Sequence, residues 1–338
     1  MVSLILQMQV ILGNGHLLEK IIKHLQKCYN VKNVIGGIML QLKPAYMPVN
    51  ICYATNENYA PYLAVSMYSL LCNADKARLY DIVILHSAIS YDSVSLLERV
   101  GALFSNCTVR LVDMTEFRER VKDATHAYIT AETNYRLAIL GELFAAYDRV
   151  LYLDCDTIVE GDISELFDTD LCGKSVGGAE AVEVRVFAMT KKGFIIDGYP
   201  YNFEDYAKKF MGITDLSRYF NAGVTLFDLK RCRKLTSAEA AVELLNKRKW
   251  MNNDQDVLNM LFTGSIFKLD QKWNYTTNIE LEVSLRDPRL KKLLADVRRT
   301  EYGIIHYTSG NKPWNSEVPL GEHYHKYEKA LKEELSWQ

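Results

Sequence analysis

An alternation of strand-like and helix-like segments begins at residue 49 and constrains the fold more than any other feature. Short apolar runs typical of buried strands alternate with longer segments in which apolar residues recur at helical spacing. The predicted strands are 49–54, 82–85, 109–112 and 150–153, and the predicted helices between them are 59–73, 90–100 and 134–147. This order favours an α/β fold with a largely parallel sheet and helices on both faces. Ligands of such sheets bind at the carboxyl ends of the strands.

The second half of the chain follows a less regular pattern. We predict helices at 203–210 and 238–249 and strands at 224–227 and 304–307. Residues 182–201 combine basic residues, glycines and aromatics without a clear period, so we predict a long loop or lid there. Such loops are the usual place for substrate contacts.

Composition and charge exclude several classes of protein. The 338 residues are 49% hydrophobic, enough for one large domain or two small ones, and the formal charge of -2 favours neither nucleic acid nor an anionic membrane as main partner. Seven cysteines without paired spacing indicate a reducing compartment. No segment is apolar enough to span a membrane, and no signal peptide is visible. We therefore expect a cytoplasmic protein, with peripheral contact at the inner membrane face left open.

Two prolines, Pro44 and Pro48, bracket a junction just before the first regular strand. We predict that residues 1–48 are an N-terminal extension outside the core. Residues 49–315 then form the core domain, and residues 316–338 add a C-terminal helical tail.

The strand that ends at Leu153 is followed by two carboxylates, Asp154 and Asp156. Residues spaced i, i+2 in a strand point the same way, and two neighbouring carboxylates are costly unless a positive group joins them. A hard divalent cation such as Mg²⁺ or Mn²⁺ is the natural occupant. The alternative is a pair of solvated carboxylates in a turn, or a cap for the next helix.

His306 follows a predicted strand and precedes a turn that contains Gly310 and Lys312. A neutral imidazole is a competent third metal ligand, and a glycine turn with a lysine suits phosphate oxygens. A histidine with only a structural role is the alternative.

Three further polar positions are candidates for ligand contacts. Residues 253–256 are all polar and begin an amphipathic helix. An acidic N-cap, the structural alternative, explains one of the two aspartates but not all four polar residues. Arg136 lies among apolar residues, which favours a buried or cleft-facing side chain with a partner such as a phosphate. A surface arginine is the alternative. Asn221 precedes a strand beside Gly223, where a simple turn is the alternative.

Together these motifs resemble those of family 8 glycosyltransferases, which include bacterial lipopolysaccharide galactosyl- and glucosyltransferases and, more distantly, glycogenin. The resemblance covers residues 49–315 and rests on motifs at 54–59, 135–137, 151–156, 220–224, 254–256, 306–307 and 312–314. It implies a GT-A (Rossmann-like) nucleotide-diphospho-sugar transferase fold. It also implies a retaining enzyme that moves glucose or galactose from a UDP-sugar to a glycan, lipid-linked glycan or protein.

The resemblance also implies residue roles. Asp154, Asp156 and His306 would bind Mn²⁺ or Mg²⁺, which would act as Lewis acid for the leaving UDP. Residues 54–59 would hold uracil and ribose, and Lys312 with the turn before it would hold the diphosphate. Arg136, Asn221 and Asp254 would contact the donor sugar. Gln255 would lie near the reacting anomeric carbon, where an amide is a poor nucleophile, so front-side attack assisted by the leaving phosphate is the simpler mechanism. The implied donor-binding set is Ala54, Thr55, Asn56, Tyr59, Arg136, Asp154, Cys155, Asn221, Asp254, Gln255, Ser309, Gly310 and Lys312.

Three positions depart from the family pattern. Asn56 stands where the family usually has an aspartate that accepts from uracil, and an amide oxygen can still accept that bond. Ser309 occupies the glycine position of the family's phosphate turn, with Gly310 one residue later. An acidic acceptor-side residue is not at the matching place, although Glu180 and Glu183 are near it.

Two other functions stay open. Asp154-Cys155-Asp156-Thr157 also fits the DxDxT nucleophile of haloacid-dehalogenase-type phosphatases, in which the first aspartate is phosphorylated. A whole βαβαβ unit before the motif is unusual for that family. A non-catalytic sugar-nucleotide-binding protein is the other alternative, and the intact set of presumed ligands argues against it.

Overall fold

The computed structural model describes residues 42, 48–122, 131–196, 198–277 and 287–336. Apart from Leu42, they belong to one compact unit that spans residues 43–338. The predicted extension, residues 1–48, lies outside the described residues except for Leu42 and Pro48, so its separateness stays a prediction. Among the described helices, none combines the length and apolarity needed to cross a membrane.

A seven-stranded mixed sheet forms the centre of this unit, in the order β10-β6-β9-β4-β1-β2-β3. All pairs are parallel except those that β9 makes with β4 and β6. The predicted largely parallel α/β sheet is therefore confirmed. Its strands are β1 (Val49–Thr55), β2 (Tyr80–His86), β3 (Cys107–Asp113), β4 (Arg149–Leu153), β6 (Val176–Glu180), β9 (Phe220–Asp228) and β10 (Ile266–Lys268).

Two smaller sheets complete the strand set. One has the order β11-β12-β5, and the other is a hairpin of β7 and β8. The small sheet matters for the site because β12 pairs with β5, directly after the carboxylate motif, and His306 is opposite Thr157. Their bounds are β5 (Thr157–Val159), β7 (Gly193–Ile196), β8 (Tyr199–Asn202), β11 (Tyr275–Thr276) and β12 (Ile304–His306).

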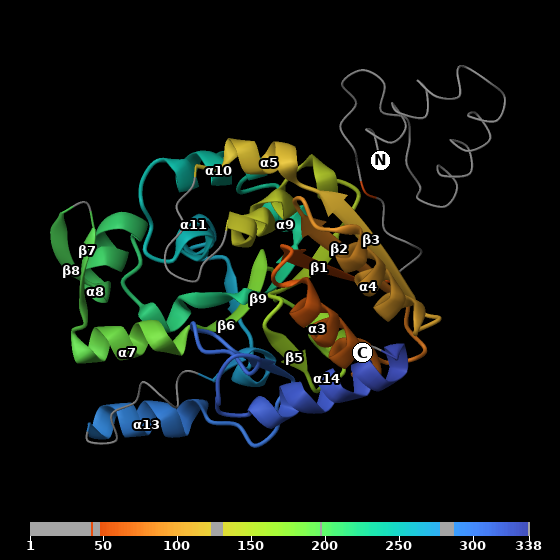
Figure 1. Ribbon diagram of the computed structural model, residues 1–338. Coiled ribbons are helices and arrows are strands. Elements are labelled where there is room, and N and C mark those ends of the chain that lie inside the picture. Colours follow the sequence, from red (N-terminus) through yellow and green to blue (C-terminus); the bar gives the residue numbers. More distant parts are fainter. Residues whose placement is uncertain (1–41, 43–47, 123–130, 197, 278–286, 337–338) are drawn as a thin grey trace, which may run out of the picture. The chain divides into compact units, whose positions relative to one another are not determined.

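Helices cover both faces of the central sheet (Figure 1). One face carries α3, α4 and the C-terminal α14, and the other carries η1, α10 and α11. The helices are α3 (Ala60–Asn73), α4 (Tyr91–Ala102), α5 (Thr115–Arg120), η1 (Ala131–Leu140), η2 (Glu142–Phe144), α6 (Ile163–Phe167), α7 (Val182–Thr190), α8 (Phe203–Tyr206), η3 (Ala207–Met211), η4 (Leu216–Arg218), α9 (Leu229–Cys232), α10 (Ala238–Asn246), α11 (Asn253–Leu261), η5 (Gln271–Asn274), α13 (Pro288–Val297) and α14 (Gly321–Leu335).

The C-terminal helix packs onto the main core. Tyr324, Tyr327 and Leu331 of α14 are buried in the same cluster as the strands. The Tyr327 hydroxyl also donates to Glu160 (2.9 Å) and accepts from the amide of Asn73 (2.7 Å). Because these side chains bury apolar surface, α14 is stabilised against the side of the core that contains α3.

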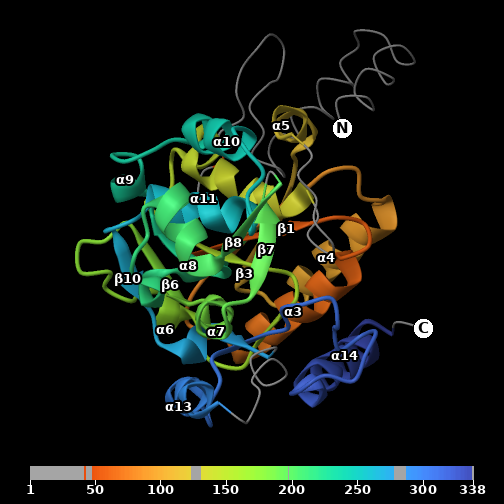
Figure 2. The same ribbon diagram turned by 90° about the vertical axis from the view of Figure 1, so that its left-hand side faces the viewer.

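The predicted loop over 182–201 is wrong. This segment forms α7 followed by the hairpin β7–β8, which lie together at one end of the unit (Figure 2). Val182 and Val186 of α7 pack against Leu290 and Leu293 of α13. The partner that orders α7 lies about a hundred residues later in the chain, so local periodicity gave no sign of it.

Smaller corrections concern element type. The predicted helix over 134–147 is two 3-10 segments, η1 and η2, with Gly141 between them. Residues 134–140 are all buried, so this segment packs against the protein on every side. It lacks the single apolar face of an amphipathic α-helix. The helix predicted over 203–210 changes into a π turn, η3, and ends at Gly212, whose φ is +70°. Residues 220–223 are part of strand β9 and do not form a turn before it.

Candidate active site

A pocket of about 440 Å³ lies at the carboxyl ends of β1 and β4 and takes in most of the predicted site residues. Of the predicted donor-binding and metal residues, all but Gly310 line it. The segments that meet there come from seven separate parts of the chain, which are residues 54–59, 132–136, 152–156, 183–192, 221, 252–255 and 306–312.

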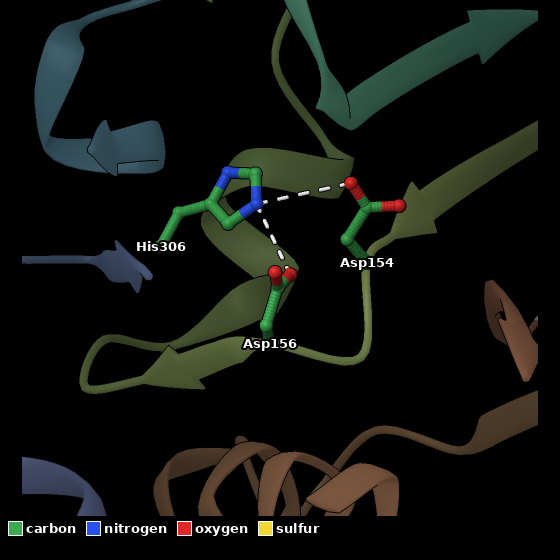
Figure 3. Close-up of side chains that lie close together, drawn as sticks. All are labelled: Asp154, Asp156 and His306. Carbon is green, nitrogen blue, oxygen red and sulfur yellow. Dashed lines mark ion pairs between the residues drawn. The ribbon is translucent and has the colours of Figure 1, made fainter. Parts of the chain in front are cut away.

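The two aspartates and His306 line the pocket together, and their side chains point toward a common centre (Figure 3). Nε2 of His306 lies 3.1 Å from Oδ1 of Asp156 and 3.8 Å from Oδ2 of Asp154. One donor atom from each residue falls within 4.8 Å of the others, the spacing of ligands around a single ion. Two oxygens and one imidazole nitrogen are a donor set that suits Mn²⁺.

The tautomer of His306 is set by a neighbouring amide. Asn274 donates its NH₂ to Oδ1 of Asn221 (2.9 Å), so its carbonyl oxygen faces Nδ1 of His306 at 2.9 Å. Nδ1 is then the protonated nitrogen, and Nε2 directs its lone pair at the two carboxylates. Three acceptor atoms that face one another in this way need a cation between them.

Gly223 makes the room for this group. A Cβ on Gly223 would lie 2.2 Å from Cε1 of His306 and 2.6 Å from Oδ2 of Asp154. The Gly223 carbonyl also accepts from the backbone N–H of Asp154 at 2.8 Å, which fixes the start of the carboxylate motif. The residues present therefore fit a divalent cation.

Each aspartate uses its other oxygen to bind a protein cation. Arg136 donates to Oδ1 of Asp154 (2.9 Å), and Lys312 donates to Oδ2 of Asp156. Burial alone would raise the pKa of Asp156, but the neighbouring Lys312 ammonium lowers it. These contacts turn one oxygen of each carboxylate toward the centre.

Arg136 links this centre to a second carboxylate, Asp254. The guanidinium is buried and lies 2.7 Å from Oδ2 of Asp254. The sequence left Arg136 either at the surface or beside a partner such as a phosphate, and in the structure it is buried against two carboxylates. Burial and the nearby Asp154 raise the pKa of Asp254 to about 7, against the opposing effect of Arg136.

Gln255 is held by two hydrogen bonds. Its carbonyl oxygen accepts from the backbone N–H of Ala222 (2.9 Å), and its NH₂ donates to the hydroxyl of Tyr219 (3.2 Å). Asp256 faces away from the pocket into the core, where Tyr206 and Tyr219 donate to it at 2.6 Å and 2.5 Å. Burial raises the pKa of Asp256, against those hydrogen bonds. Neighbours in the sequence thus lie on opposite sides of α11.

One end of the pocket begins where β1 ends. The carbonyl oxygen of Asn56 accepts from the backbone N–H of Tyr59 (3.0 Å), and its NH₂ donates to Glu132 (3.0 Å). Both ends of this amide are engaged, and the carbonyl oxygen keeps a second lone pair for a ligand. Cys155 lies behind this loop, where its thiol donates to the Ala54 carbonyl.

The turn after His306 carries a strained residue. Ser309 has φ of 98°, in the region that favours glycine, which is the residue that the family resemblance implied for this position. Ser309 and Lys312 line the pocket, and Gly310 does not.

Several residues that line the pocket lay outside the predicted donor and metal sets. They are Glu132, Thr133, Tyr152, Glu183, Phe187, Lys192, Asn252 and Thr308. Of the two acidic residues considered for the acceptor side, Glu183 lines the pocket and accepts from Asn221 (3.3 Å). Glu180 instead accepts from Arg185 (2.9 Å) and Lys268 (2.6 Å) outside it. A helical pattern recognised at 182–190 would have placed Glu183 and Phe187, spaced i, i+4, on one face.

Comparison with known proteins gives a consistent result. The model for glycosyl transferase family 8 matches residues 50–318. The chain is 27% identical over 286 residues to General stress protein A of Bacillus subtilis, covering 82% of this chain and 92% of that protein. It is 26% identical over 272 residues to lipopolysaccharide 1,2-glucosyltransferase of Escherichia coli K12, covering 79% and 73%.

Two solved structures are similar. Galactosyltransferase LgtC in complex with donor and acceptor sugar analogs has a TM-score of 0.63 and 26% identity, over 83% of this chain and 95% of that chain. The bifunctional glycosyltransferase WbbM has a TM-score of 0.75 and 26% identity over 87% of this chain. This chain spans only 53% of WbbM.

Proposed function

The chain belongs to glycosyl transferase family 8 and has a GT-A α/β fold, and on this premise we propose that it is a metal-dependent, retaining hexosyltransferase. The proposed donor is UDP-glucose or UDP-galactose, and the proposed acceptor is a growing cell-surface glycan, free or lipid-linked. The observation that carries the proposal is the joining of Asp154, Asp156 and His306 in one pocket with Asp254 and Gln255. A relative that acts on lipopolysaccharide supports the acceptor class.

Asp154, Asp156 and His306 would hold Mn²⁺ or Mg²⁺, which supplies positive charge against the departing diphosphate. Residues 54–59 and Glu132 bind the nucleoside, because they form the end of the pocket that follows β1. Asp254, fixed by Arg136, accepts hydrogen bonds from donor-sugar hydroxyls. Glu183 and Phe187 on α7 lie on the acceptor side.

In the proposed reaction the bond between the anomeric carbon and the UDP oxygen breaks, and a bond to the acceptor oxygen forms on the same face. The proton of the acceptor hydroxyl passes to the departing phosphate oxygen. Gln255 orients the sugar and does not attack it, because an amide is a poor nucleophile, and its carbonyl oxygen is fixed by the Ala222 N–H. Family membership does not support the phosphatase alternative.

The test is release of UDP from each common UDP-sugar with Mn²⁺ and with EDTA. We expect slow, Mn²⁺-dependent release that Asp156→Asn abolishes. The matched control is Asp296→Asn, which removes an exposed carboxylate paired with Lys292 on the surface. Binding of UDP without release from any sugar would favour the non-catalytic alternative, and UDP affinity unchanged in Asp156→Asn would refute the metal assignment.

A further inference from the structure

Behind Gln255 lies a buried hydroxyl whose hydrogen bonds are all in use. Tyr219 is fully buried and does not line the pocket. Its hydroxyl donates to Oδ1 of Asp256 (2.5 Å) and accepts from Nε2 of Gln255 (3.2 Å) and Nδ2 of Asn252 (3.1 Å). A phenol has one proton and two lone pairs, so these three bonds saturate it.

The Asp256 carboxylate fixes the direction of these bonds. It also receives hydrogen bonds from the hydroxyl of Tyr206 (2.6 Å) and the backbone N–H of Asn252 (2.9 Å). Surrounded by donors, Asp256 is the acceptor, so the proton of the Tyr219 hydroxyl points at it. The lone pairs of that hydroxyl are left for the two amides that line the pocket.

We propose that Tyr219 is a positioning residue that selects the orientation of the Gln255 side-chain amide. An amide has a donor end and an acceptor end, and a hydroxyl that can only accept selects the NH₂ end. The Ala222 N–H favours the same orientation, because it donates to the carbonyl oxygen of Gln255. Because the oxygen and the NH₂ of the amide are both held, Gln255 presents its remaining N–H and its remaining lone pair to the sugar in a fixed geometry.

This role deepens the proposed function, and the expected effect of Tyr219 on catalysis rests on that function. Its structural part stands alone, because the orientation of an amide is measurable without turnover. Loss of the hydroxyl would let the amide rotate, and misplacement of a group beside the reacting carbon lowers kcat more than donor binding.

The chain offers a matched control. Tyr206 donates to the other oxygen of the same carboxylate, at 2.6 Å, and has no hydrogen bond to Gln255. Tyr206→Phe and Tyr219→Phe therefore each remove one buried hydroxyl from Asp256, and only the second removes a partner of Gln255. A purely structural role predicts equal effects of the two variants.

The first measurement is the side-chain NH₂ resonance of Gln255 in protein labelled with ¹⁵N-glutamine, identified by its loss in Gln255→Ala. We expect it to move in Tyr219→Phe and to stay in place in Tyr206→Phe. An unmoved resonance in Tyr219→Phe overturns the proposal whether or not the protein turns over UDP-sugars.

The second measurement is Mn²⁺-dependent donor hydrolysis. We expect kcat to fall about tenfold to a hundredfold in Tyr219→Phe with little change in KM, and to stay near wild type in Tyr206→Phe. Added to Gln255→Ala, the Tyr219→Phe change should cost nothing further. Equal losses in the two tyrosine variants, or full additivity with Gln255→Ala, would overturn the proposal. Absence of turnover in the wild type would count against the proposed function alone.

Discussion

The backbone of Gly223 lies against the ring of His306 so closely that a Cβ on Gly223 would be 2.2 Å from Cε1. Strand β9 thereby sets the distance between His306 and Asp154. Close approach of this kind requires glycine for steric reasons alone, since the φ angle of Gly223 is not in the left-handed region.

We expect Gly223→Ala to weaken Mn²⁺ binding at least about tenfold, because the ring must move away from the carboxylates. Titration followed by Mn²⁺ electron paramagnetic resonance measures this directly. Gly193→Ala is the control, since a Cβ there meets its nearest atom only at 3.8 Å. Equal Mn²⁺ affinity in the two variants would contradict the steric argument.

A second prediction concerns pH. Burial and the Asp154 charge raise the pKa of Asp254 to about 7, despite Arg136. The folded protein therefore holds this proton more tightly than the unfolded chain between about pH 4 and pH 7. Its contribution to stability is complete below that window and is lost as the pH rises through it.

We expect the free energy of unfolding in EDTA to fall from pH 5 to pH 7 in the wild type, and to fall less in Asp254→Asn. Urea unfolding at several pH values gives the comparison. Asp287→Asn is the control, because hydrogen bonds from Arg289 lower the pKa of that exposed carboxylate to about 2, below this range. Parallel pH profiles for wild type and Asp254→Asn would show that the Asp254 pKa is not raised.

The closeness of Asp154 and Asp156 was predictable because it needs only local rules. An apolar strand that ends in two carboxylates, in a parallel sheet, leaves few places for Asp154 and Asp156. His306 was a weaker candidate from the residues alone, because its approach to the carboxylates depends on the pairing of β12 with β5. Strand pairing between segments about 150 residues apart has no local signature.

The orientation of the acidic residues of α11 was harder to predict for a geometric reason. Asp254 and Asp256 look equivalent in the sequence, yet two residues along a helix turn by about 200°. Asp254 therefore faces Arg136 and the pocket, and Asp256 faces Tyr206 and Tyr219 in the core. Which of the two faces inward depends on where α11 packs, and the residues that decide this are distant in the chain.

A third prediction concerns the strained turn. Ser309 has φ of 98°, which costs a residue with a Cβ on the order of 1–3 kcal/mol. Ser309→Gly removes this strain and adds the smaller entropic cost of glycine in the unfolded chain. We expect a net stabilisation of about 1 kcal/mol, with UDP affinity retained. Urea unfolding measures it.

Ser316→Gly is the matched control for this turn, because Ser316 is not among the described residues with positive φ. There glycine brings only its entropic cost, so stability should fall. A loss of stability in Ser309→Gly as well would mean that the Ser309 side chain, which donates to the Asn311 carbonyl at 3.3 Å, outweighs the strain.

The last prediction separates two roles of Lys312. Its buried ammonium donates to the carbonyl of Tyr307 and to Asp156. The Asp156 oxygen that it contacts is the one that faces away from His306. In this position the ammonium competes electrostatically with any cation held by the same carboxylate. When a diphosphate is present, the same charge is attractive to it. Removal of the charge should therefore act in opposite directions on the two ligands.

We expect Lys312→Met to bind Mn²⁺ alone roughly tenfold more tightly, and to bind UDP in the presence of Mn²⁺ more weakly than the wild type. Isothermal titration with each ligand gives both values. Lys268→Met is the control, since Lys268 pairs with the buried Glu180 outside the pocket and should change neither affinity. If both affinities fall in Lys312→Met, the ammonium is needed to build the metal site and does not compete with the ion. If Mn²⁺ affinity rises while UDP affinity is unchanged, Lys312 serves only as the partner of Asp156, and the diphosphate is held by the metal and the turn at Ser309.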